Sequence, residues 1–113
     1  MTKKRKLVLA KPRVRADLHW TQTHEAIAFI SAAVGEAFCT ADATGLAWGA
    51  LATPDPETGE LGYPVMLEIG KDPTQVDRII VSFMAVLGDH AAFMKLYAII
   101  GWARQHDIAV ETD

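Results

Sequence analysis

Four histidines carry most of the acid–base chemistry available to this chain, and each stands near a carboxylate in the sequence. The pairs are Asp17 with His19, His24 with Glu25, Asp89 with His90, and His106 with Asp107. A neighbouring carboxylate can orient an imidazole for proton transfer. The pattern therefore leaves acid–base chemistry open, with a histidine as the reacting group.

The sequence lacks the residue spacings that are typical of metal binding, nucleophilic catalysis and nucleotide binding. No His-x-x-x-His or Cys-x-x-Cys motif occurs, so we expect no metal site. Neither serine lies in a Gly-x-Ser-x-Gly turn, and Cys39, the single cysteine, has no obvious base beside it. Gly45 and Gly49 do not form a phosphate-binding loop, and the three tryptophans are more typical of a core or an interface than of ligand stacking. We expect no cofactor, and the balance leans away from an enzyme.

Hydrophobic spacing predicts the first elements that would position these groups. Residues 6–10 (KLVLA) predict a short strand that stops before Pro12, because the residue before a proline avoids helical geometry. Apolar residues at three- and four-residue steps then predict a helix over residues 24–38, with Thr23 as its N-cap.

A β-hairpin is predicted in the middle of the chain. Residues 45–53 and 61–69 flank a turn that contains two prolines and Gly59, which can adopt a left-handed conformation. The second arm alternates, with Leu61, Tyr63, Val65, Leu67 and Ile69 on the face that we expect to be buried. Pro64 in this arm favours an edge strand or a bulge, because proline cannot donate to a central ladder.

The last third of the chain predicts a strand, a helix and a closing strand. Residues 76–87 fit a helical stripe but are rich in β-branched residues, so we favour a central strand and keep a helix as the alternative. Asp89 is a good N-cap for a helix over residues 90–105, and residues 108–111 predict a short strand. The order is β-α-β-β-β-α-β, an α+β fold with two main helices packed on a small mixed or antiparallel sheet, or β-α-β-β-α-α-β in the alternative.

Charge divides the chain into a basic arm, residues 1–15, and an acidic body, residues 16–113, which we expect to be a single domain. Seven of the eleven basic residues and no acid lie in the arm. The body has four bases against fourteen acids, a net charge of −10. The candidate anion- or nucleic-acid-binding residues are therefore Lys3, Lys4, Arg5, Lys6, Lys11, Arg13 and Arg15. The alternative is that the arm adheres to its own acidic body or to that of a second subunit.

Length and hydropathy limit the location of the protein. The richest apolar run, residues 79–87, is far shorter than the roughly 20 residues of a membrane-spanning helix. The basic N-terminus is followed by no apolar stretch typical of a signal peptide. One cysteine permits no intramolecular disulfide, as is usual in a reducing compartment. We expect a cytoplasmic protein without membrane insertion.

Three segments carry a family resemblance: residues 43–54 (ATGLAWGALATP), residues 76–83 (VDRIIVSF) and the predicted helix that opens at His90. Together they resemble phosphotransferase-system enzyme IIA domains of the mannitol, fructose and nitrogen-regulatory type. In that family a Thr-Gly-x-Gly-x-Gly-x-Ala-Ile-Pro-His stretch presents the phosphorylated histidine, and a second histidine opens a later helix. His90 matches the second histidine, but Asp55 stands where the family carries the phosphoryl acceptor. The resemblance implies a domain that has kept the scaffold and lost this transfer.

These observations predict a small binding or regulatory domain that acts without catalysis, through protein–protein contacts and as a homo-oligomer. The alternative from another class is an enzyme or phosphoryl acceptor that uses His90 with Asp89 or Asp55 as catalytic residues. A third hypothesis has the basic arm attach the domain to nucleic acid.

Overall fold

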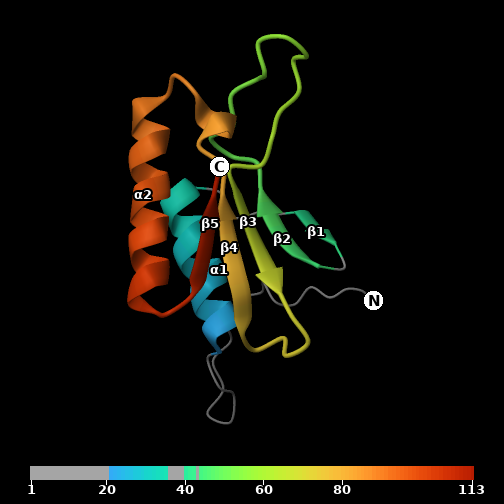
Figure 1. Ribbon diagram of the computed structural model, residues 1–113, viewed down its shortest axis with the longest axis vertical. Coiled ribbons are helices and arrows are strands. Elements are labelled where there is room, and N and C mark those ends of the chain that lie inside the picture. The colour runs from blue at the N-terminus through green and yellow to red at the C-terminus, as the bar shows by residue number, and fades with distance from the viewer. Residues whose placement is uncertain (1–20, 36–39, 43) are drawn as a thin grey trace.

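Two helices pack on one five-stranded sheet in the computed structural model, which describes residues 21–35, 40–42 and 44–113 (Figure 1). The strands follow chain order across the sheet: β1 Thr40–Asp42, β2 Gly45–Trp48, β3 Val65–Ile69, β4 Val76–Val81 and β5 Ala109–Thr112. Neighbours are antiparallel except β4 and β5, which are parallel and joined through α2 His90–Gln105. A parallel pair needs such a crossover. The α+β class and the mixed sheet are confirmed, whereas the strand predicted over residues 6–10 lies outside the described residues.

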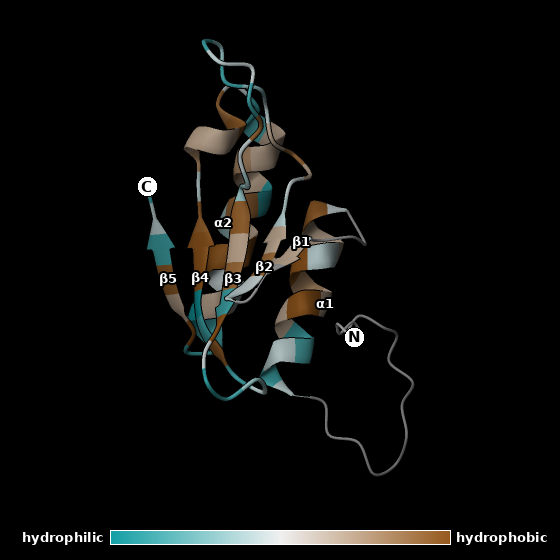
Figure 2. Ribbon diagram, turned by 90° about the vertical axis from the view of Figure 1, so that its right-hand side faces the viewer, coloured by the Kyte–Doolittle hydropathy of each residue, from teal (hydrophilic) through white to brown (hydrophobic). Residues whose placement is uncertain are grey.

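The core lies between the sheet and the two helices, α1 Gln22–Val34 and α2, which contact each other and the sheet (Figure 2). The register places Trp48 and Val81 on either side of Val65, and all three side chains are fully buried. Trp48 also joins the two layers, because its Nε1–H donates to Ser31 Oγ on α1 at 3.2 Å. Residues directly opposite one another share a face of the sheet, so this register defines the helix-covered face.

The first helix begins and ends earlier than the apolar spacing predicts. Thr21, not Thr23, is the N-cap, and its Oγ1 accepts from the His24 backbone N–H at 3.2 Å. The end predicted at residue 38 is also wrong, because Gly35 adopts a left-handed φ of 75° and its N–H closes the helix on the Ser31 carbonyl.

Thr23 and Gln22 instead attach α1 to the turn between β3 and β4. The Thr23 hydroxyl donates to the Pro73 carbonyl at 2.7 Å, and Gln22 Oε1 accepts from the Val76 backbone N–H at 2.7 Å. These bonds pair two backbone groups in and just before β4 with side chains of α1. Thr23 is therefore buried by a long-range contact that no local capping pattern contains.

The predicted hairpin forms, but its strands are shorter and its second strand is central. β2 ends at Trp48 and β3 begins at Val65, so a loop of residues 49–64 separates them. β3 pairs with β2 on one side and β4 on the other, which corrects the edge position expected from Pro64. Pro64 lies just before the first ladder residue, so its missing N–H removes no ladder bond. Its carbonyl accepts from the Ser82 N–H at 2.8 Å.

Residues 76–87 contain both structures that the sequence left open. β4 Val76–Val81 is a central strand, as favoured, and the strand prediction is wrong beyond it, where η2 Met84–Val86 forms a turn of 3₁₀ helix. The helix predicted over residues 90–105 is confirmed, and β5 begins and ends one residue later than expected. Among the described residues, no helix has the length and apolar character to cross a membrane.

Candidate functional site

Asp89 and His90 lie at the start of α2, where Asp89 has a structural task. Its Oδ1 accepts from the Ala92 backbone N–H at 3.0 Å, which makes it the N-cap of the helix. His90 is the first residue of the helix and is exposed. The carboxylate that would orient the imidazole is thus directed at the helix backbone.

Asp55 begins a turn in the loop between β2 and β3, which its backbone N–H closes on the Glu60 carbonyl at 2.9 Å. Its Oδ1 accepts from the backbone N–H groups of Glu57 at 2.7 Å and Thr58 at 3.1 Å. These two bonds hold the pKa of the Asp55 carboxyl below its ordinary value, so it is ionised at neutral pH. Gly59 takes the left-handed φ of 75° expected for this turn. Asp55 therefore both shapes the turn and carries a negative charge there.

The loop of residues 49–64 lies against the segment that follows β4 and encloses a depression of about 550 Å³, the loop hollow. Two backbone bonds fix its base, from Thr53 N–H to the Ala85 carbonyl and from Ser82 N–H to the Pro64 carbonyl, both at 2.8 Å. Asp55 is among the described residues that line the hollow, and Asp89 and His90 are not. The hollow is thus built from one loop and the η2 segment.

Large apolar side chains stand exposed around the loop hollow. Leu61 is 63% exposed, Tyr63 45%, Met84 63% and Leu87 50%, and all four line it. They are four of the six large apolar residues that are exposed in the described part of the chain. Exposed apolar side chains gathered in one place mark an interaction surface more often than scattered ones do.

Sequence reasoning missed this surface because Leu61 and Tyr63 continue the alternation of β3. Alternation predicts that they are buried with Val65 and Leu67, but the strand begins only at Val65. Pro64 is the signal that marks this boundary, since it ends the run of residues able to donate to the ladder.

The rim of the loop hollow is acidic. Asp55, Glu57 and Glu60 are exposed on the loop, and residues 49–64 and 82–94 contain no lysine or arginine. Asp113 accepts from Ser82 Oγ, which belongs to a residue that lines the hollow, at 2.6 Å and from the Phe83 N–H at 3.0 Å. The bond from Ser82 is the main cause that lowers the pKa of Asp113, so this group is also ionised. The hollow combines apolar walls with negative charge.

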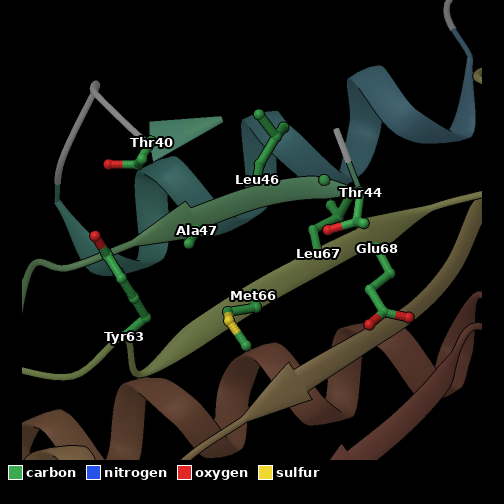
Figure 3. Close-up of a pocket in the computed structure, with 9 residues that line it drawn as sticks. Thr40, Thr44, Leu46, Ala47, Tyr63, Met66, Leu67 and Glu68 are labelled. Carbon is green, nitrogen blue, oxygen red and sulfur yellow. The ribbon is translucent and has the colours of Figure 1, made fainter. Parts of the chain in front are cut away.

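A second, smaller hollow of about 210 Å³ lies on the face of the sheet opposite the helices (Figure 3). Met66 and Glu68 of β3 reach it beside Ala47 of β2, while Leu46 points to the other side. Tyr63 lines both hollows and so connects this face with the loop hollow. Beyond Glu68, Arg78 pairs with Glu68 at 2.7 Å and with Glu111 at 3.0 Å, so this part of the open face is polar.

The other candidate residues fall outside this geometry. The seven bases of the arm and Cys39 lie outside the described residues. No group of three or more histidine, cysteine, aspartate or glutamate side chains that could hold a metal ion occurs in the described part of the chain. Comparison with protein-family models, curated proteins and solved structures gives no match. The resemblance to enzyme IIA domains stays a prediction.

Proposed function

We propose that this protein is a non-catalytic binding domain that docks a segment of a protein partner in the loop hollow. The observation that carries the proposal is that four exposed apolar side chains, Leu61, Tyr63, Met84 and Leu87, line one depression. Burying such side chains stabilises a complex by about 25 cal/mol per Å² of apolar surface removed from water. The domain would act in the cytoplasm, which the cysteine content predicts.

Two further features favour a peptide segment as the ligand. The hollow is open and large, and its walls come from backbone segments that are fixed at their base by Thr53 and Ser82. A preformed apolar groove needs little ordering on binding, which lowers the entropic cost of association. The acidic rim would select segments that carry lysine or arginine beside apolar residues.

Selection of peptides from a displayed random library on the full chain tests this proposal. We expect selected peptides to combine apolar and basic residues, and to bind Met84→Ser at least about tenfold more weakly than the wild type. Met94→Ser is the matched control, because Met94 is 55% exposed on α2 and does not line the hollow. Peptides that bind both variants equally well would contradict the proposed docking surface.

A further inference from the structure

We propose that the segment held in the loop hollow is the basic arm of a second copy of this chain, so that two copies exchange their arms. The inference rests on the proposed function, because it names the occupant of the same hollow. It draws on three properties: charge, apolar content and the distance between the arm and the hollow.

Charge complementarity is the first argument. The arm has seven bases and no acid in its fifteen residues, and the body carries a net charge of −10. Asp55 and Glu60 of the loop line the hollow, Glu57 is exposed on the same loop, and Asp113 is bonded to Ser82, which also lines the hollow. Opposite potentials of this kind speed the encounter of two surfaces and fix their register.

The distribution of apolar residues within the arm is the second argument. Residues 7–10 (LVLA) are apolar and lie between a basic cluster at residues 3–6 and the bases at 11, 13 and 15. The hollow offers both kinds of partner, with Leu61 and Met84 exposed in its lining together with the carboxylates of Asp55 and Glu60. An apolar run flanked by bases therefore finds partners of both kinds at one place.

The distance along the chain favours a second copy over the same molecule. The arm precedes α1 in the chain, and the loop of residues 49–64 lies towards the end of the molecule opposite the start of α1 (Figure 1). Arg15 is six residues from Thr21, which spans at most about 20 Å, and Lys11 is ten residues away, or about 35 Å. A molecule that fills its own hollow must use part of its arm as the tether from α1, so fewer of its bases can contact the hollow. A neighbouring copy can place its whole arm there.

Sedimentation velocity of the full chain over a concentration series tests the inference. We expect self-association that is stronger at about 0.01 M than at about 1 M ionic strength, because the Debye length falls from about 30 Å to about 3 Å. Two changes are each expected to weaken the dimer at least about tenfold: Met84→Ser, and an arm variant that combines Lys3→Gln, Lys4→Gln, Arg5→Gln and Lys6→Gln. Met94→Ser, the control, should change the dissociation constant by less than about twofold.

A mixing experiment separates exchange between copies from attachment within one copy. The arm variant keeps an intact hollow, and a hollow variant that combines Met84→Ser with Glu60→Lys keeps an intact arm. Each alone should be largely monomeric, and their mixture should contain dimers that neither variant forms by itself. A mixture no more associated than its two components would place the arm on its own body and overturn the inference.

Two other results would also overturn the inference. One is a wild-type chain that stays monomeric at every concentration, and the other is a dimer that neither Met84→Ser nor the arm variant weakens. The proposed function can survive both, because library peptides that need Met84 would still show a docking surface. These experiments therefore distinguish a failure of the inference that the arm is the bound segment from a failure of the proposed docking surface.

Discussion

Gly45 in β2 and Gly101 in α2 differ in the space that is available for a side chain. A Cβ on Gly45 would overlap the Leu67 carbonyl oxygen of the neighbouring strand, whereas a Cβ on Gly101 in α2 would meet no atom within 4 Å. We expect Gly45→Ala to lower the free energy of unfolding by about 1–3 kcal/mol, because backbone must move. Gly101→Ala should raise it by about 0.5–1 kcal/mol, since alanine is the better helix former. Urea unfolding of both variants measures the difference, and equal effects would contradict the close approach of β2 and β3.

Substitutions of the neighbouring residues Asp89 and His90 distinguish a structural role from a chemical one. Asp89→Ala removes the N-cap of α2 and should cost about 1 kcal/mol of stability, while His90→Ala at an exposed position should change it by less than about 0.5 kcal/mol. Thermal unfolding followed by circular dichroism measures both. An activity of the wild type that His90→Ala abolishes without loss of stability would support the enzymatic alternative and contradict the binding domain.

At the scale of elements, local patterns predicted α2 well and its surroundings less well. The Asp89 cap and the apolar spacing locate this helix, because both signals lie within the element. For α1, the apolar spacing predicts Thr23 as the N-cap, but Thr21 forms a local capping box with His24. The Thr23 hydroxyl instead bonds to the Pro73 carbonyl fifty residues away. The central position of β3 depends on partners that alternation does not reveal. The position of β3 in the sheet was therefore determined by long-range strand pairing, which local spacing does not predict.

The η2 segment depends on the charge of Asp113, which gives a pH dependence. The bonds from Ser82 Oγ and from the Phe83 and Met84 N–H groups favour the ionised carboxylate and hold its pKa below the ordinary value near 3.8. A group whose pKa is lowered on folding stabilises the fold above its unfolded pKa, and this stabilisation is lost as the pH falls through the folded pKa. We expect Asp113→Asn to be less stable than the wild type at about pH 7, with a smaller gap at about pH 2. Urea unfolding at both pH values measures the difference in free energy of unfolding between the two proteins. A difference that does not change with pH would contradict the role of the ionised Asp113 carboxylate.

The candidate site emerges only at the scale of the whole molecule. The sequence indicates Asp55, Asp89 and His90 as candidates for chemistry, yet Asp55 shapes a turn and Asp89 caps a helix. The loop hollow instead joins residues 53–63 to residues 82–87 through the packing of a loop on η2. Its apolar walls could not be predicted from hydropathy, because the same residue types fill the core. Which apolar residues remain exposed depends on where β3 begins and on what the helices cover.

Trp48 links the two layers of the fold, and its loss tests whether they unfold as one unit. Trp48 is fully buried on the sheet and donates to Ser31 of α1, whereas Trp102 is partly exposed and stacks on Phe29 at a centroid distance of 5.0 Å. Trp48→Ala should lower the free energy of unfolding by about 3–5 kcal/mol, which approaches the whole stability of a small domain. Trp102→Ala should cost about 1–2 kcal/mol, since it removes the stacked contacts of Trp102 with Phe29 and with His106 at the edge of the core. Denaturant unfolding by far-ultraviolet circular dichroism measures both, and similar losses would show that the layers are held together elsewhere.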